Sequence, residues 1–174
     1  NKYENNITVL GLPGINGSYK ARNASISFLE KNFEDTLFID DDVRVQEFRN
    51  YYFKNNQIRG PLVKFFENPA DDFENWYFEN AFNQKRFKKS FSFLPTIFLF
   101  IPTSVFLEMK GFNDQLLSGG DMDFCFRAKN HLNCEIKLNE DIVVQTHLRN
   151  KSQILNKLSR QHFGHLYLAK LKLA

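Results

Sequence analysis

The chain has 174 residues and a mass of 20.5 kDa, with 43% hydrophobic and 25% charged residues. These values exclude a disordered tail and a disulfide-stapled miniprotein, and they predict one globular domain over residues 1–174. The net charge of +3 is unevenly distributed, because the last 33 residues carry six basic side chains and no acidic ones.

Short strands and helices are predicted to alternate through the first half of the chain. Apolar runs bounded by glycine, proline or aspartate indicate strands, and longer periodic stretches indicate helices. The expected elements are a strand over 7–12, a helix over 20–32, a strand over 36–39, a helix over 46–55, an extended segment over 58–66 and a helix over 71–87.

The second half continues the alternation. It predicts a strand over 96–101, a helix starting near Thr103, a helix over 121–130, short strands over 135–138 and 142–145, and an amphipathic helix over 152–171 within a C-terminal segment of about 150–172. Strands that alternate with helices favour an α/β fold with a mostly parallel, Rossmann-like sheet flanked by helices.

Residues 90–107 form the longest uncharged run, and its length raises the question of a membrane span. Pro95 and Pro102 interrupt the run, and prolines fit the ends of a strand better than the interior of a helix. We therefore expect a buried strand here. The two cysteines, Cys125 and Cys134, have no metal-binding spacing, so we expect reduced, buried thiols of a cytoplasmic protein.

Three aspartates, Asp40 to Asp42, directly follow the strand predicted over 36–39. A carboxylate cluster at the C-terminal end of a strand lies where open α/β sheets bind ligands. Two carboxylates at positions i and i+2 could hold a divalent ion together with phosphates. The alternative is an ordinary turn, because aspartate favours turns.

A second cluster runs from Gly119 to Asp123 and is followed by Arg127. The glycines permit a close approach of a ligand to the backbone, and acids in a first helical turn are favoured by the helix dipole. Alternatively, Asp121 and Asp123 cap the helix and Arg127 is the helical ion-pair partner of Asp123. His147, after the strand over 142–145, is either structural or a ligand.

In this order and spacing the motifs resemble those of the family 2 glycosyltransferases of the GT-A fold, over residues 7–164. The resemblance is carried by Gly17-Ser18-Tyr19-Lys20-Ala21-Arg22-Asn23, Leu37-Phe38-Ile39-Asp40-Asp41-Asp42, Val105-Phe106, Gly111-Phe112-Asn113-Asp114 and Ser118-Gly119-Gly120-Asp121-Met122-Asp123-Phe124 with Arg127.

The resemblance implies a role for each matching position. On the donor side it implies nucleotide contact by Arg22, sugar or ribose contact by Asp40 with Asp41 beside it, and a loop at the sugar–acceptor junction formed by Gly119 and Gly120. It implies that Asp42 and His147 approach a divalent metal, Mg²⁺ or Mn²⁺. Asp121 takes the place of the general base that deprotonates the acceptor hydroxyl.

The resemblance thus implies a non-processive, inverting transferase that moves a sugar from a nucleotide-diphosphate sugar to a glycan or lipid-linked acceptor in polysaccharide biosynthesis. The expected location is the cytoplasm, with peripheral contact of the basic C-terminal helix at the inner membrane. The basic segment could equally hold a diphosphate or be a solvated helix face. No nucleic-acid motif accompanies it, so we expect no nucleic-acid partner.

The sequence departs from the family's pattern, and two alternative functions remain open. The family's first strand and helix have no counterpart before residue 7, which implies an N-terminally incomplete chain. An inactive remnant that acts only as a binding module is therefore one alternative. A metal-dependent phosphohydrolase or nucleotidyltransferase is another, although the motif from Gly119 to Arg127 disfavours it. The Gln-x-x-Arg-Trp motif of processive synthases is absent from the sequence.

Overall fold

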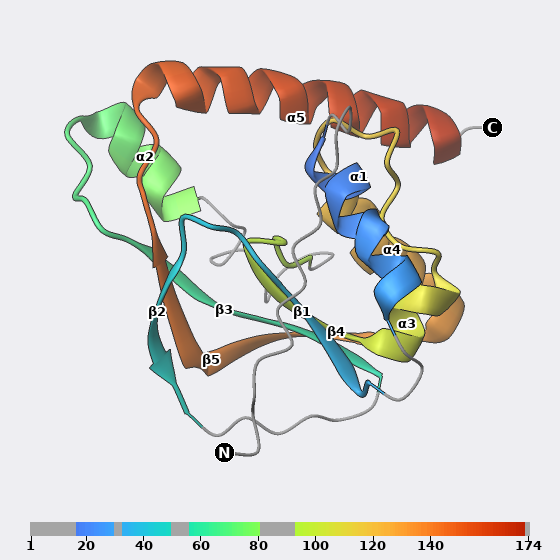
Figure 1. Ribbon diagram of the computed structural model, residues 1–174. Coiled ribbons are helices and arrows are strands. Elements are labelled where there is room, and N and C mark those ends of the chain that lie inside the picture. Colours follow the sequence, from blue (N-terminus) through green and yellow to red (C-terminus); the bar gives the residue numbers. More distant parts are fainter. Residues whose placement is uncertain (1–16, 30–32, 50–55, 81–92, 173–174) are drawn as a thin grey trace.

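The computed structural model describes residues 17–29, 33–49, 56–80 and 93–172 (Figure 1). Its strands are β1 (Asp35–Ile39), β2 (Arg44–Phe48), β3 (Gln57–Phe65), β4 (Phe98–Pro102) and β5 (Glu135–Thr146). Its helices are α1 (Ser18–Asn23), the 3₁₀ helix η1 (Ala24–Phe28), α2 (Asp72–Asn80), α3 (Thr103–Glu108), α4 (Gly120–Leu132) and α5 (Lys151–Lys172). The strand predicted over 7–12 lies outside the described residues.

The five strands form one sheet in the order β1-β4-β3-β5-β2. Only β3 and β5 run parallel, whereas the β1–β4, β3–β4 and β2–β5 pairs are antiparallel. The α/β class is confirmed, but the prediction of a mostly parallel sheet was wrong. Alternation of strands and helices along the chain does not determine direction, and here β2 follows β1 after only four residues, too few for a helical crossover.

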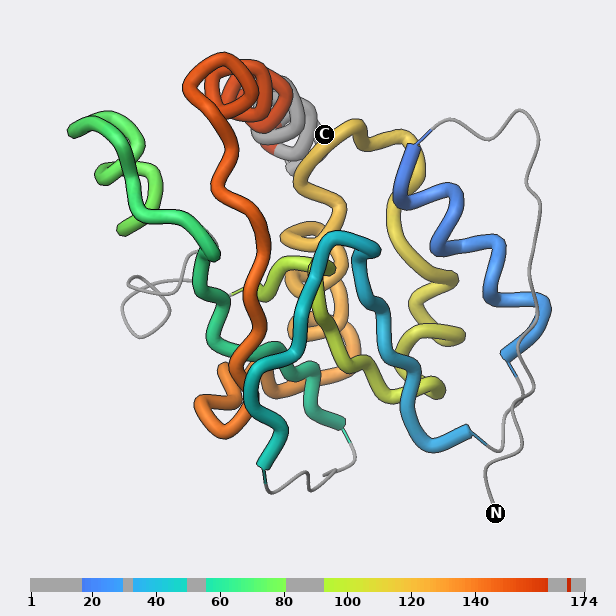
Figure 2. The backbone as a smooth tube through the Cα atoms, turned by 60° about the vertical axis from the view of Figure 1, so that its left-hand side comes forward, coloured from blue at the N-terminus to red at the C-terminus, as the bar shows by residue number. Residues whose placement is uncertain are grey.

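The sheet is curled, because its two edge strands are joined by a short connection. Neighbouring strands lie about 4.8 Å apart, so a flat sheet would separate the first and fifth strands by about 19 Å. An extended chain reaches at most about 18 Å over the five peptide units from Ile39 to Arg44, and residues 41 and 42 form a turn. The edges must therefore approach each other, as Figures 1 and 2 show for β1 and β2.

Several predicted boundaries changed for identifiable reasons. The helix predicted over 46–55 was wrong where it is described, because residues 44–48 pair with β5 as strand β2. The two short strands predicted over 135–138 and 142–145 are one strand, β5, whose residues 140–142 bulge opposite Pro61 and Leu62 of β3. The helix predicted over 20–32 narrows to the 3₁₀ helix η1 after Asn23.

Side-chain caps mark the starts of two helices and explain where these helices begin. At α2, Asp71 Oδ1 accepts from the backbone N–H of Glu74 at 2.7 Å, and the Glu74 side chain accepts from Ala70 N–H at 2.9 Å. At α5, the side chains of Asn150 and Gln153 accept reciprocally from each other's backbone N–H at 3.0 Å. Such pairs satisfy donors that have no intrahelical partner.

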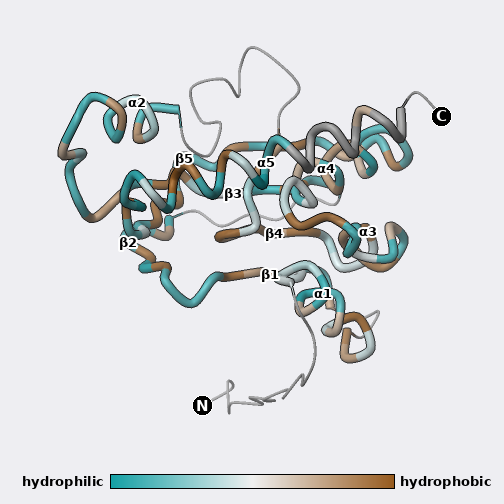
Figure 3. The backbone as a smooth tube through the Cα atoms, turned by 90° about the horizontal axis from the view of Figure 1, so that it is seen from above, coloured by the Kyte–Doolittle hydropathy of each residue, from teal (hydrophilic) through white to brown (hydrophobic). Residues whose placement is uncertain are grey.

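The core is aromatic and lies between the sheet and helices α3 and α4. Phe112 is central to it, with ring centroids 5.4 Å from Phe38, 5.5 Å from Phe106 and 5.0 Å from Phe124. A smaller cluster on the other face includes Phe98, Phe100 and Val144. Strand β4 therefore contributes to both clusters and is buried along its whole length. Its residues are hydrophobic, as the colour of β4 in Figure 3 shows.

The uncharged run over 90–107 thus forms a buried strand and a short helix over the part that is described, which confirms the expectation from its prolines. In the part of the chain that the structure describes, every helix is too short or too polar to cross a membrane. Cys125 and Cys134 are both buried and unlinked, as expected.

Candidate functional site

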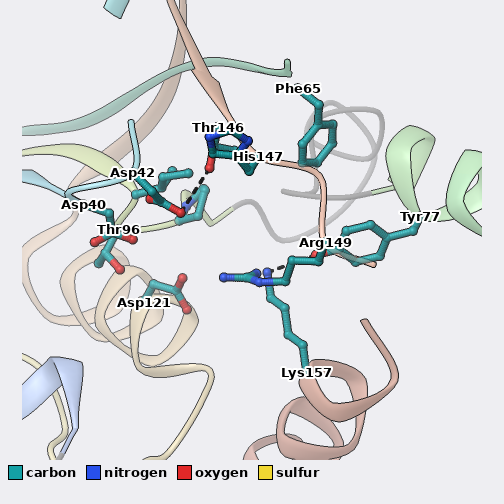
Figure 4. Close-up of a pocket in the computed structure, with 12 residues that line it drawn as sticks. Asp40, Asp42, Phe65, Tyr77, Thr96, Asp121, Thr146, His147, Arg149 and Lys157 are labelled. Carbon is teal, nitrogen blue, oxygen red and sulfur yellow. Dashed lines mark hydrogen bonds between the residues drawn. The ribbon is translucent and has the colours of Figure 1, made fainter. Parts of the chain in front are cut away.

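The C-terminal ends of β1, β3 and β5 meet at one edge of the sheet. The register places Ile39 opposite Phe98 and Phe65 opposite Thr146, so the segments that follow these strands emerge together with the start of β4. An open pocket of about 120 Å³ lies at this edge (Figure 4). Its lining consists of Asp40, Asp42, Phe65, Tyr77, Pro95, Thr96, Ile97, Asp121, Thr146, His147, Arg149 and Lys157.

Asp40, Asp42, Asp121 and His147 all line this pocket, although the first and last are more than 100 residues apart in the sequence. The fold therefore brings these four side chains to one pocket, whereas their chemical roles stay predictions. The physical reason is the strand direction: β1 and β5 both end at this edge, and α4 begins there.

The two aspartates after β1 are held differently. The backbone N–H of Asp40 donates to Ile97 O at 3.0 Å, and its carboxylate forms an ion pair with Arg22 of α1. Asp42 Oδ2 accepts from the buried hydroxyl of Thr146 at 3.4 Å, and the rest of Asp42 is exposed. Asp41 is exposed and is absent from the pocket lining.

Asp121 lies in the first turn of α4. Gly119 enters the helix in the left-handed region, with φ of 84°, and its carbonyl accepts from Asp123 N–H at 2.9 Å. Asp121 Oδ1 accepts from Met122 N–H at 2.9 Å. Burial raises the pKa of the Asp121 carboxyl, and the Met122 N–H and the Lys157 charge oppose that rise in part. A partly buried carboxylate with a raised pKa is a typical general-base candidate.

Tyr19 and Arg22 of α1 connect the segment that carries Asp40 with the segment that carries Asp121. The Tyr19 ring packs against Gly120, where an added Cβ would lie 2.7 Å from two ring carbons. The guanidinium of Arg22 lies 5.9 Å from the centre of the same ring. Burial and the nearby charge of Asp121 raise the pKa of Tyr19. Arg22, Gly119 and Gly120 thus shape the site without lining the pocket.

Arg127 fixes the loop before α4. Its Nε donates to Asp123 Oδ2 at 2.8 Å, and its two terminal nitrogens donate to Met109 O at 3.0 Å and Gly111 O at 2.9 Å. The ion pair expected from the spacing of Asp123 and Arg127 is therefore confirmed. This pair is structural and does not line the pocket.

His147 is engaged at the pocket rim. Its Nδ1 lies 2.5 Å from Glu67 Oε1, and Glu67 Oε2 accepts from Leu148 N–H at 2.8 Å. These interactions lower the pKa of the Glu67 carboxyl, with the Leu148 N–H as the largest cause. The His147 ring also packs on Phe66, with centroids 4.9 Å apart. The end of β5 is thereby tied to the end of β3.

The sequence reasoning did not identify Arg149, Lys157, Phe65 or Tyr77 as site residues. Lys157 Nζ donates to the Tyr77 hydroxyl at 3.2 Å, which links α5 to α2 beside the pocket. Arg149 stands two residues after His147, and that proximity is a signal that could have found it. The signal for Lys157 was weaker, because the basic C-terminal segment could hold a diphosphate but a lysine on an amphipathic helix is usually solvated.

The described residues contain no group of three His, Cys, Asp or Glu side chains placed to hold a metal ion. Asp42 and His147 both line the pocket, but they do not form a dedicated cage. Magnesium is commonly held by one or two carboxylates together with substrate phosphates. The donor set therefore fits only a divalent ion whose coordination a bound ligand completes.

Comparison with known proteins found no matching family model and no curated protein of significant sequence similarity.

Proposed function

We propose that this chain is a glycosyltransferase domain of GT-A-like fold that moves a sugar from a nucleotide-diphosphate sugar to a hydroxyl of a glycan or lipid-linked acceptor. The observation that carries the proposal is the convergence of Asp40, Asp42 and Asp121 in one pocket at the carboxyl ends of the strands. Ligands of open α/β folds bind at such an edge. The motif resemblance supplies the reaction class.

Each carboxylate has a distinct task in this proposal. Asp40 is oriented by Arg22 and accepts hydrogen bonds from ribose or sugar hydroxyls. Asp42, which is more exposed, faces the phosphates and contributes to binding Mg²⁺ or Mn²⁺ with them. A divalent ion held there would stabilise the negative charge of the leaving diphosphate. His147 borders the same end of the pocket.

Asp121 is the proposed general base. Its raised pKa makes it a better proton acceptor than an exposed aspartate, because a stronger base removes the acceptor proton more readily. One base on the acceptor side favours a direct displacement with inversion at the anomeric carbon. The acceptor hydroxyl attacks that carbon, its proton passes to Asp121, and the nucleoside diphosphate leaves.

Binding and turnover of the purified chain test the proposal. Calorimetric titration with nucleoside diphosphates should show Mn²⁺-dependent binding that Asp42→Ala abolishes. Asp121→Asn should bind as the wild type does but should not release nucleoside diphosphate from nucleotide sugars. Asp41→Asn is the matched control, because this carboxylate is an exposed neighbour that does not line the pocket, and it should behave as the wild type.

The outcomes separate the alternatives. Binding without turnover in the wild type would favour a binding module over an enzyme. A wild-type chain that binds no nucleoside diphosphate, or an Asp42→Ala variant with unchanged metal dependence, would contradict the proposal.

A further inference from the structure

Two cationic side chains line the pocket opposite its carboxylates. Arg149 lies between β5 and α5, and Lys157 lies on α5 itself. Figure 4 shows the Arg149 side chain extending toward the space bounded by Asp42 and Asp121, and the Lys157 side chain rising from α5 toward the Tyr77 hydroxyl. Of the described residues that line the pocket, these two are the arginine and the lysine that can carry its positive charge.

The Lys157 side chain is held near the pocket by a contact at its tip, whereas the exposed Arg149 side chain is positioned by its backbone. Lys157 Nζ donates to Tyr77 Oη at 3.2 Å, and Tyr77 is only 5% exposed, so this ammonium has a fixed neighbour. The capping box of Asn150 and Gln153 fixes the backbone next to Arg149. Such anchoring lowers the entropy that long side chains lose when they bind a ligand.

The carboxylate side is partly neutralised from outside the pocket. Arg22 pairs with Asp40, which leaves Asp42 and Asp121 as the acids opposite the cations. The pocket is therefore bipolar. A ligand that fits it has anionic oxygens that accept from Arg149 and Lys157, and hydroxyl groups that donate to the carboxylates of Asp40 and Asp121. A sugar joined to a phosphate or diphosphate has this distribution.

We propose that Arg149 and Lys157 form a phosphate subsite that binds the diphosphate part of a ligand directly, without a metal ion. The identification of that ligand as a nucleotide sugar rests on the proposed function. The subsite itself rests on the two cations, their anchors and the pocket that they line. Arginine matches phosphate geometry with its planar fork, and lysine adds a compact charge.

Inorganic pyrophosphate in the presence of EDTA is the probe that isolates the subsite, because it contains neither sugar nor base and no metal can bridge it to Asp42. Equilibrium dialysis or ³¹P NMR titration measures the affinity. We expect measurable binding to the wild type, and a loss of about tenfold in each of the variants Arg149→Gln and Lys157→Gln, since each removes a charge-assisted hydrogen bond.

Arg160→Gln is the matched control, because it removes the same charge from the exposed surface of α5 outside the pocket, and we expect unchanged affinity. Asp42→Asn tests whether the Asp42 charge strengthens or weakens pyrophosphate binding. It should leave metal-free pyrophosphate binding unchanged or tighter, because it removes a like charge. Circular dichroism melting checks that each variant is folded, and Arg149→Gln decides the question if Lys157→Gln loses its Tyr77 contact and unfolds.

Three results would overturn the inference: no metal-free binding by the wild type, full affinity in both cation variants, or a loss in Asp42→Asn as large as theirs. A failure of the proposed function gives a different pattern, with intact pyrophosphate binding but no metal-dependent nucleoside diphosphate binding and no turnover. The two hypotheses can therefore fail separately.

Discussion

Replacing Arg127 with methionine should destabilise the protein by about 3 kcal/mol, an estimate that follows from what the guanidinium holds. Its three hydrogen bonds join α4 to the loop carbonyls of Met109 and Gly111 and to the Asp123 carboxylate. The Asp123 side chain is 11% exposed, so removing its partner leaves a nearly buried charge uncompensated.

The size of the effect follows from the ion pair, because its loss strands the Asp123 charge. Breaking a fully buried ion pair costs about 3–5 kcal/mol. The Arg127 side chain is 25% exposed, so solvent screening places the value at the lower end. A loss of about 3 kcal/mol corresponds to a fall in Tm of roughly 6–12 °C for a chain of this size.

Urea unfolding monitored by circular dichroism measures this loss, and a double-mutant cycle tests its cause. Asp123→Asn removes the stranded charge, so adding it to Arg127→Met should restore about 1 kcal/mol or more. The stability of Arg127→Lys should lie between that of the wild type and that of Arg127→Met. A lysine keeps the positive charge, but one ammonium cannot reach the three acceptors that the planar guanidinium reaches. A loss below about 1 kcal/mol in Arg127→Met, or strict additivity in the cycle, would refute the reasoning.

Two further substitutions test other parts of the structure. Gly120→Ala should lower the free energy of unfolding by about 1–3 kcal/mol, because the added Cβ would meet the Tyr19 ring at 2.7 Å. Thermal melting of this variant and of the double variant with Tyr19→Leu measures the loss. An equal loss of stability in both variants would argue against the clash. Asp35→Asn should stabilise the protein at pH 7 by up to about 1 kcal/mol, after allowance for solvent screening. Burial and Glu34 raise the pKa of Asp35 from 3.8 to about 6, so the folded state binds more protons between these values and loses stability as pH rises through them. Urea unfolding at pH 4 and pH 7 should therefore show a gain for the variant only at the higher pH, and a gain of equal size at both would contradict the assignment.

Much of the local structure follows from the amino-acid sequence by itself. The prolines around Phe98 delimit a strand, Asp71 and Glu74 cap a helix, and the spacing of Asp123 and Arg127 forms an ion pair on one helical face. Each of these features depends on residues within a few positions of one another. Local steric and hydrogen-bonding preferences are therefore sufficient to predict them.

The sequence also located the acids of the pocket, because a carboxylate cluster after an apolar strand has few local explanations. The sequence could not show which side chains contact these acids. Arg22, which was predicted to contact the nucleotide, pairs with the pocket acid Asp40 and does not itself line the pocket. Gly120, which was predicted in a loop at the sugar–acceptor junction, provides room for the Tyr19 ring, and its part in ligand binding stays a prediction. Both outcomes depend on how α1 packs against the rest of the fold.

Only the tertiary structure decided the direction of the strands and the cationic side of the pocket. The segment after β1 could have continued as a helix, yet it returns as β2 and pairs with β5, nearly 100 residues later. Lys157 reaches the pocket because α5 lies beside α2 and bonds to Tyr77. Long-range pairing of this kind is determined by burial and hydrogen bonding across the whole chain. It therefore cannot be predicted from the residues that flank each partner in the sequence.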